Sequence, residues 1–278
     1  MKKIILSLGA VTAVLVGASM FAAFEAHVVN VTAKIENALS VNATELDFGT
    51  VFPQENLAQP VSVALSGSFM TENRVDDVSY MIRQKPKCGW TLNNGELLLG
   101  LPTYTGEVYA GTADPLPPYS VQHDGYYVVC PDPGTPVRPA GSVYAELPSL
   151  CQYISKHKED DGQFGSPTAP GPEVQVNSFH QPFVIDPNGG IDWTEAKGYL
   201  SKSFLLGDNQ TYDTQDNWLI DLAVPCFGGY CAQDWEDFVD LISGDPTTNG
   251  TDYTQPIANE HKVFGCDLWF EVTGVSQS

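Results

Sequence analysis

The sequence predicts an all-β protein, an antiparallel β-sandwich whose sheets come from the first and last thirds of the chain. Apolar and polar residues alternate before residue 86 and again after residue 216, which is the two-residue period of strands with one buried face. The stretch from about 86 to 215 is instead dense in Pro, Gly and Asp, and it holds three of the six cysteines. We interpret it as a long, irregular insertion pinned by disulfides between two strand-rich regions.

The first 22 residues have the order of a secretory signal. A basic pair is followed by an apolar run over 4–20 and then by the small residues Ala22 and Ala23, so about 22 residues are expected to be removed. The apolar run is at the short end for a membrane span, so cleavage is favoured over a retained anchor. We expect a mature chain, 23–278, that forms a single β-sandwich domain, is secreted or held at the cell surface, and meets the membrane only during export.

A long strand, or two collinear strands, is predicted directly behind this signal over residues 29–41. Its apolar positions alternate with mostly polar ones and would share one buried face: Val29, Val31, Ala33, Ile35, Leu39 and Val41. Because the strand begins a few residues behind the cleavage site, the mature N-terminus would be an ordered apolar ribbon. An uncovered ribbon of this kind pairs readily with other strands, so something must cover it.

Shorter strands are predicted on both sides of the insertion. Before it, alternation indicates strands at 44–48, at 61–65 and at 78–84, the last of which ends before a proline. After it, the run at 217–224 is the clearest strand of the second half, and the last strand is expected at 263–272.

Helical periodicity is rare in this chain. Residues 232–242 have apolar side chains at i, i+3, i+4 and i+7, which predicts a helix over one end of the sandwich. A second, short helix is predicted at 149–158 inside the insertion, and a small strand is predicted to begin at 171–176.

The charge of the chain is strongly negative, at −21 from 13 basic and 34 acidic residues. Removal of the signal deletes two lysines and no acid, so the mature charge is 11 − 34 = −23. Nucleic acid is therefore excluded as a partner, because phosphate binding needs a basic face. Solubility outside the cell or cation binding fits this charge better.

Six cysteines follow the export signal, an even number that predicts disulfides: Cys88, Cys130, Cys151, Cys226, Cys231 and Cys266. Zinc is the rival interpretation, but the chain has no Cys-x-x-Cys pair and its five histidines are scattered without ligand spacing. Only Cys226 and Cys231 are close enough in sequence to predict a local bridge. Six cysteines allow fifteen connectivities, and the other pairs stay open.

No catalytic residues are predicted. The chain lacks a His-Glu-x-x-His sequence, and Glu260-His261 has no second histidine one helical turn away. A Gly-x-Ser-x-Gly sequence is absent too, so the sequence indicates no serine nucleophile of a hydrolase.

Calcium is the one cofactor with some support in the sequence. Asp186, Asn188 and Asp192 place oxygen donors at alternate positions around glycines, and 208–213 is a second candidate. Neither stretch matches a complete twelve-residue calcium loop. An Asx turn explains both equally well.

The first 65 or so residues resemble a known family. The apolar signal with its Met20-Phe-Ala-Ala-Phe junction, the stretch 37–41, and Glu45-Leu-Asp-Phe-Gly-Thr-Val-Phe-Pro-Gln-Glu are similar to the TasA/camelysin family of secreted bacterial biofilm-fibre proteins. The whole chain also resembles secreted proteins of small-genome candidate bacterial phyla. The likeness to the fibre proteins covers about the first 65 residues, and the cysteines depart from those cysteine-poor proteins.

This resemblance implies cleavage of the signal between Ala22 and Ala23. It also implies a jelly-roll sandwich that polymerises when the N-terminal strand of one subunit fills a gap in the next, with a homopolymer or other surface proteins as partners. The alternative is a monomeric surface domain for adhesion or carbohydrate binding, in which Tyr126-Tyr127 or Trp235 provides an aromatic platform. A third possibility, implied by camelysin alone, is a secreted metalloprotease.

Overall fold

The computed structural model describes residues 35–92, 94–98, 100–134, 138–158, 174–206 and 209–276, with the backbone alone at 203–206 and 209–212. The chain divides into two compact units, 1–36 and 37–278, and all strands described below belong to the second. This unit begins 14 residues (37 − 23) after the start expected for the sandwich domain. The predicted signal and residues 29–34 of the strand expected over 29–41 lie outside the described residues, and of the described remainder only 39–41 form a strand. No helix in the described ranges is long and apolar enough to cross a membrane.

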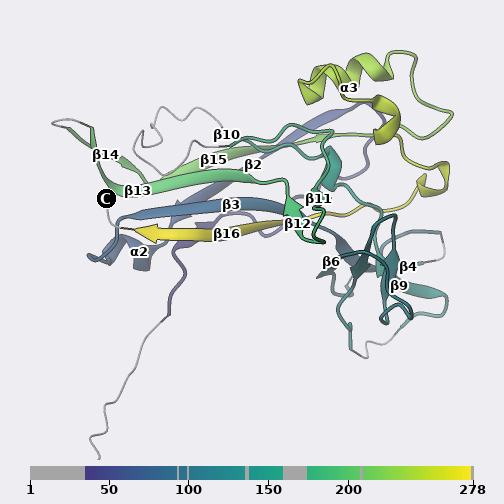
Figure 1. The fold of residues 1–278 in the computed structure, drawn as a ribbon, viewed down its shortest axis with the longest axis horizontal. Helices are drawn as coiled ribbons and strands as arrows, with labels where there is room; N and C mark the ends of the chain where they lie inside the picture. Colours follow the sequence, from purple (N-terminus) through teal and green to yellow (C-terminus); the bar gives the residue numbers. More distant parts are fainter. Residues whose placement is uncertain are drawn as a thin grey trace, which may run out of the picture. The chain divides into compact units, whose positions relative to one another are not determined.

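Two four-stranded antiparallel sheets form the body of this unit, which confirms the all-β class (Figure 1). The first sheet has the order β1 (Leu39–Val41), β2 (Asn56–Leu65), β15 (Gln215–Ala223), β10 (His157–Lys158). The second has the order β14 (Asn209–Asp213), β13 (Ala196–Leu206), β3 (Asp77–Lys85), β16 (Asp267–Ser276).

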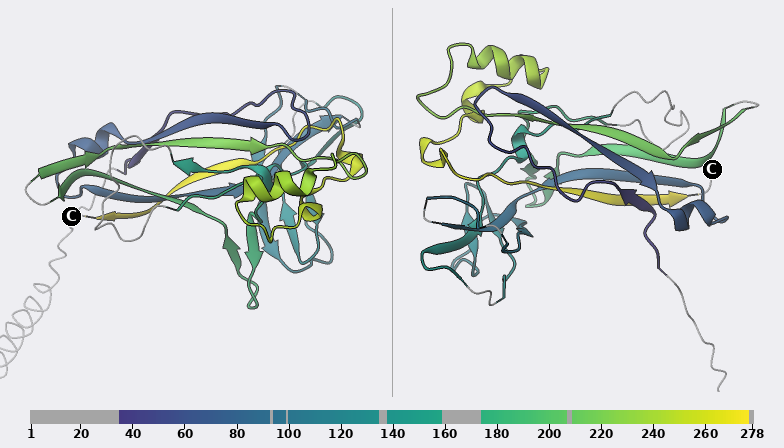
Figure 2. Two further views of the ribbon diagram at one scale, coloured as in Figure 1. Left: turned by 90° about the horizontal axis from the view of Figure 1, so that it is seen from above. Right: turned by 180° about the vertical axis from the view of Figure 1, so that it is seen from behind.

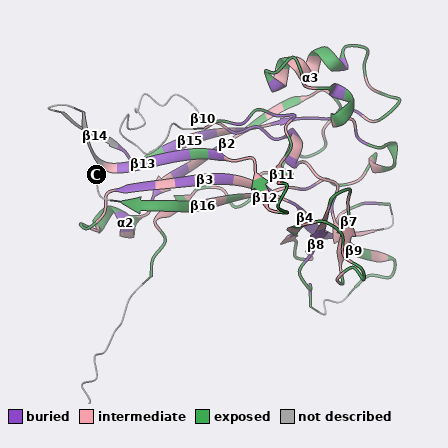
Figure 3. Ribbon diagram, viewed as in Figure 1, coloured by how far each residue is buried: buried purple, intermediate pink, exposed green. Residues whose placement is uncertain are grey.

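The core lies between these sheets and is built from the alternating residues of four strands. The side chains of β2 and β15 that face it include Val61, Val63, Trp218, Ile220 and Leu222, and those of β3 and β13 include Val78, Tyr80, Ile82 and Leu200. All nine are at most 2 % exposed, so the predicted faces of the strands at 61–65, 78–84 and 217–224 are confirmed. Figure 3 shows the buried stripe along these strands.

One side of the sandwich is closed by a short bridging segment. Val176 pairs with Lys156, next to β10, while Val174 pairs with Lys197 of β13. Two residues of one segment thus connect the edges of the two sheets through backbone hydrogen bonds. Of the strand predicted at 171–176, residues 171–173 lie outside the described residues, and Val174 and Val176 form these isolated pairings.

The insertion is shorter and more regular than expected. It contains one three-stranded sheet of β5 (Tyr104–Thr105), β4 (Lys87–Leu92) and β9 (Ser142–Glu146), and another of β6 (Glu107–Ala110), β8 (Tyr126–Val129) and β7 (Ser120–Gln122). A hairpin of β11 (Phe183–Ile185) and β12 (Ile191–Trp193) follows. The small sheets and α3 gather at the same end of the sandwich (Figures 1 and 2).

The prediction that the insertion runs to residue 215 is wrong, because β13 and β14 belong to the main sheet. The inward positions of β13 are Ala196, Gly198 and Leu200, and the small size of the first two weakened the alternation. Gly198 lies directly opposite Tyr80, and a Cβ at this position would overlap the ring of Tyr80. The large ring therefore fills the space that the small residue leaves.

Two further local predictions are wrong. Residues 44–48 form no strand, although Leu46 and Phe48 pack against the core. At 149–158 the helix is limited to one 3-10 turn, η1 (Cys151–Tyr153), after which the chain is extended and pairs with β15. Pairing with a neighbouring strand outweighed the weak helical pattern.

The helix predicted at 232–242 is confirmed as α3 (Trp235–Ser243), with Trp235 and Val239 buried. It ends at Gly244, whose φ of 68° is the left-handed conformation favoured at a helix C-terminus. The remaining helical turns are α2 (Gly67–Thr71), η2 (Gly250–Tyr253) and η3 (Ile257–Asn259).

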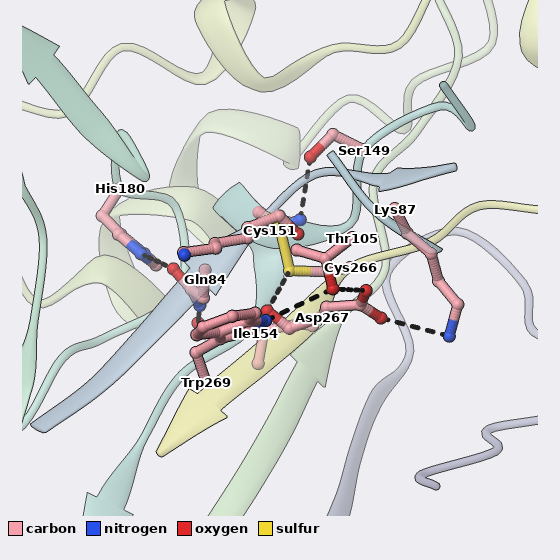
Figure 4. Close-up of a disulfide and its surroundings, with 11 residues drawn as sticks. Gln84, Lys87, Thr105, Ser149, Cys151, Ile154, His180, Cys266, Asp267 and Trp269 are labelled. Carbon is pink, nitrogen blue, oxygen red and sulfur yellow. Dashed lines mark hydrogen bonds and ion pairs between the residues drawn. A yellow bond between two sulfur atoms is a disulfide. The ribbon is translucent and has the colours of Figure 1, made fainter. Parts of the chain in front are cut away.

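All six cysteines form disulfides: Cys88–Cys130, Cys151–Cys266 and Cys226–Cys231. The local bridge was predicted, and the two long-range pairs were not assigned from sequence. The Cys151–Cys266 disulfide connects the residue before β16 to the insertion. Asp267, the first residue of β16, also contacts Lys87 and Thr105 of the insertion (Figure 4).

Candidate functional site

The strongest candidate site is the outer edge of β16, the last strand. Within the described ranges, β16 pairs with β3 on one side and with no strand on its other side. Ten residues long, it leaves a row of backbone donors and acceptors available for a further strand.

The side chains of β16 that face the core are incompletely covered. Val272 lies opposite Tyr80, and Val275 lies opposite Val78, so both point to the buried face of the sheet. Their partners are 1 % and 0 % exposed, whereas Val272 and Val275 are 39 % and 46 % exposed. The green colour of much of β16 in Figure 3 shows this exposure. Two apolar residues therefore face inward and remain partly exposed.

A bulge is responsible for the inward position of Val275. The register with β3 shifts between Val272 and Gly274, which adds one residue to β16 at Thr273. Without this residue, the alternation would turn Val275 outward. The same shift interrupts the two-residue period, and for this reason the sequence-based strand ended at residue 272.

The inward side chains of β16 are incompletely covered because β1, in the opposite sheet, is short. Since the bridging segment joins the sheets beside β10 and β13, the strand orders place β1 and β16 on the other side of the sandwich. There β1 contributes three residues, whereas β16 contributes ten. The chain after β1 covers part of this side with Leu46, Phe48 and Val51, without pairing as a strand.

The beginning of β16 is fixed by side-chain contacts, in contrast to its end. Trp269 donates from Nε1 to Thr105 Oγ1 at 3.3 Å and lies under Lys85 Nζ, 3.6 Å from the ring centroid. Figure 4 shows the contact of Trp269 with Thr105. Glu271 forms an ion pair with Arg83 at 3.2 Å. We define the acceptor edge as residues 272–276, the part of β16 beyond the anchored beginning.

The predicted assembly strand is only partly within the described residues. Val29, Val31 and Ala33 lie outside them, as do the cleavage residues Ala22 and Ala23. Ile35 is exposed and is not part of a strand. Leu39 and Val41 form β1 and pair with Leu65 and Val63 of the same chain. These last two residues are thus already used in the subunit's own sheet.

A second candidate site is a cavity of about 370 Å³ between the insertion and the β11–β12 hairpin. Tyr126 stacks on His123 with ring centroids 4.6 Å apart and meets Phe183 edge-on at 5.0 Å. Glu146 Oε2 lies 2.7 Å from His123 Nε2. Burial, followed by the nearby Glu146 carboxylate, raises the pKa of Tyr126 to about 12, so its hydroxyl stays protonated.

This cavity mixes carboxylates, amides and aromatic edges. Asp124, Glu146, Gln152 and Gln181 line it together with Tyr126 and Phe183. Hydroxyl-rich neutral ligands fit such a lining, because amides and carboxylates bind hydroxyls and aromatic rings pack on their apolar faces.

Of the predicted aromatic platforms, only the first is accessible. Trp235 is 5 % exposed and donates from Nε1 to Gly250 O at 2.9 Å, so it belongs to the core. Tyr126 lines the cavity, while Tyr127 stacks on Tyr109 at 5.3 Å on the other face of β8.

The calcium candidate Asp186 is used in a turn. Its Oδ1 accepts hydrogen bonds from the backbone amides of Asn188 at 2.6 Å and Gly190 at 3.0 Å, which is an Asx turn closing the β11–β12 hairpin. Asp192 lies in β12 opposite Val184. The described part of the chain contains no group of three or more His, Cys, Asp or Glu side chains that could hold a metal ion.

Glu260-His261 is the pair considered above as part of a protease motif. Glu260 Oε1 lies 3.8 Å from His261 Nε2, and both side chains are exposed.

No family model, curated protein or solved structure matches this chain. The observed fold alone defines the class: an antiparallel β-sandwich protein with three disulfides and an incompletely covered sheet edge.

Proposed function

We propose that this protein is a secreted structural subunit that assembles into an extracellular or cell-surface fibre by strand addition. In this proposal, residues 29–36 of one copy, the donor segment, pair with the acceptor edge of the next copy. The observation that carries the proposal is the exposure of Val272 and Val275, which face inward on an edge strand without a full cover.

The donor segment has the chemistry that this edge lacks. Val29, Val31, Ala33 and Ile35 alternate with Asn30, Thr32 and Lys34, so one face of an added strand would be apolar. Backbone pairing with β16 would supply affinity, and the alternating side chains would set the register over Val272 and Val275. Because Leu39 and Val41 stay in the subunit's own sheet, they would hold the donor segment at its base.

The chemical setting of the chain is consistent with this role. Three disulfides are compatible with an oxidising, extracellular location. The resemblance of the first 65 residues to the TasA/camelysin proteins supports a fibre or biofilm matrix, and strand addition would cover an edge that is otherwise prone to aggregation.

The test compares the mature protein, which starts at Ala23, with a form that starts at Asn37. The shorter form lacks the donor segment and keeps β1 and the rest of the sandwich. We expect the mature protein to form regular filaments in negative-stain microscopy and the shorter form to stay monomeric. Val31→Asp should prevent filaments, whereas Thr32→Asp should leave them, since only the former places a charge against the apolar side chains of the acceptor edge. A mature protein that stays monomeric at high concentration, or equal effects of the two substitutions, contradicts the proposal.

The cavity around Tyr126 supports a second candidate function, binding of a neutral carbohydrate. The expected result is calorimetric binding of one or more members of a panel of neutral oligosaccharides, weakened about tenfold by Glu146→Gln through loss of a charge-assisted hydrogen bond. Glu107→Gln is the matched control, because Glu107 is exposed and bonds Tyr109 instead of lining the cavity. Absence of binding at millimolar sugar would count against this function.

A further inference from the structure

A buried ion pair crosses the edge of the first sheet. Lys158 Nζ lies 2.7 Å from Asp216 Oδ1, and the two side chains are 6 % and 0 % exposed. Lys158 lies in β10 and pairs in register with Trp218 of β15, two residues beyond Asp216. The amine and the carboxyl group therefore meet inside the sandwich, on adjacent strands.

The carboxyl group of Asp216 is held on both of its oxygens. The hydroxyl of Tyr80 donates to Oδ2 at 2.5 Å, and Trp218 Nε1 donates to the Tyr80 hydroxyl oxygen at 2.6 Å. Tyr80 and Trp218 are 1 % and 0 % exposed, and their rings meet edge-on at 6.4 Å. Lys158, Asp216 and Tyr80 thus form a fixed arrangement that is closed to water.

This interior does not favour charged amines. Lys156, two residues earlier on the same side of the extended segment, is fully buried, and burial lowers its pKa to about 7. Keeping two charges buried is costly, and an ion pair recovers that cost only in part. Transfer of one proton within the pair removes both charges and leaves an amine beside a carboxylic acid, the two reactants of amide formation.

We propose that Lys158 and Asp216 condense into an intramolecular amide bond. The lone pair of Nζ attacks Cγ of Asp216, while the Tyr80 hydroxyl stabilises the negative charge that develops on Oδ2. A proton then moves from Nζ to Oδ1, the bond between Cγ and Oδ1 breaks, and Oδ1 leaves as water. One ammonium and one carboxylate become one amide and one water, with no oxidant or cofactor. Fixed positions supply the proximity that this slow reaction needs.

The bond would connect β10 to β15 covalently and close a loop of 216 − 158 = 58 positions. Unlike the three disulfides, it would survive reducing conditions. The inference does not depend on fibre assembly, because the atoms involved all belong to one chain.

The test is the intact mass of the purified, folded protein after reduction and denaturation. We expect a mass lower than that of the sequence by one water molecule. Tryptic mapping should show no cleavage after Lys158 and a branched peptide that contains both Lys158 and Asp216. A folded protein with the full sequence mass, or a loss of water that maps elsewhere, overturns the proposal.

Variants locate the reaction. Lys158→Met should restore the full mass, whereas Lys87→Met should not, since the ion pair of Lys87 with Asp267 is partly exposed, at 28 % and 22 %. Tyr80→Phe keeps the ring and removes the hydroxyl, so the fraction of cross-linked protein should fall severalfold. If Lys158→Met still lacks one water, the proposed bond between Lys158 and Asp216 is wrong. If Tyr80→Phe is fully cross-linked, the proposed role of Tyr80 is wrong.

Discussion

At the scale of single residues, the interior of this sandwich contains buried polar side chains, among them Gln84 and Lys156, in addition to the apolar residues of its strands. Beside Lys156 lies His180, whose Nε2 is 2.7 Å from Gln84 Oε1, and Gln84 in turn donates to Ile154 O at 2.9 Å. Burial, followed by the positive charge of Lys156, lowers the pKa of His180 to about 3. His180 is therefore neutral at ordinary pH and serves as a hydrogen-bonding core residue. Figure 4 shows His180 directed at Gln84.

Lys156 should make the stability of the protein depend on pH. Its pKa is about 7 in the folded chain and 10.5 in the unfolded chain, so the unfolded chain binds more protons between these values. Stability therefore rises as pH increases from about 7 to 10.5, and the cost of burial is fully present below this window. We expect Lys156→Met to raise the free energy of unfolding at pH 7 by on the order of 3 kcal/mol.

Chemical denaturation at several pH values measures this effect. The advantage of Lys156→Met over the parent should shrink as pH approaches 10.5. Lys197→Met, at an exposed lysine, is the control and should change little. A variant with the stability and pH dependence of the parent would show that Lys156 carries no burial cost.

At the scale of elements, β16 combines protection at its start with exposure at its end. Ion pairs, a disulfide and the packing of Trp269 hold its first half, and the bulge keeps its second half facing inward. A bulge is one of the usual ways to discourage edge pairing. Here it turns Val275 inward on the same face as Val272, so the edge remains suited to one apolar strand in a defined register.

The acceptor edge can be tested without altering the donor. Val272→Asp should abolish filaments, because an added strand would bury an unpaired carboxylate. The folded monomer should lose little stability, since Val272 is already 39 % exposed. Val143→Asp is the matched control, at a valine that is 50 % exposed in β9 of the insertion. Sedimentation and thermal unfolding measure the two effects, and filaments from Val272→Asp would exclude β16 as the acceptor.

At the scale of the whole molecule, assembly brings together chains of strong like charge. The net charge of −21, or −23 after loss of the predicted signal, makes copies repel at low ionic strength. At 0.15 M salt the screening length is about 8 Å, and repulsion between neighbours weakens accordingly. We therefore expect filament growth to speed up as sodium chloride increases from about 0.01 M to 0.15 M.

Light scattering follows this growth. Sucrose at matched viscosity separates screening from changes in transport, and the form starting at Asn37 should show no growth at any salt concentration. Growth that slows as salt increases would indicate that attraction between charges, rather than apolar strand addition, drives assembly.

Much of the molecule was determined by local pattern. The strands around Val63, Ile82 and Ile220 have large apolar residues at every second position, and α3 has its own helical stripe, so neighbours in sequence are sufficient to define them. The Cys226–Cys231 bridge was predictable for the same reason, since five positions separate its ends. The N-terminal alternation likewise supplied the donor half of the proposed assembly.

Tertiary structure alone decided the rest, because it depends on residues distant in sequence. The small residue Gly198 in β13 is explained only by the ring of Tyr80 that packs against it. The disulfides Cys88–Cys130 and Cys151–Cys266 join positions that are 42 and 115 residues apart. The exposure of Val272 and Val275 depends on the three-residue length of β1 in the opposite sheet. The meeting of Lys158 with Asp216 follows from the register of β10 on β15. Local sequence determines which residues can be buried, but only the pairing of strands determines what each of them meets.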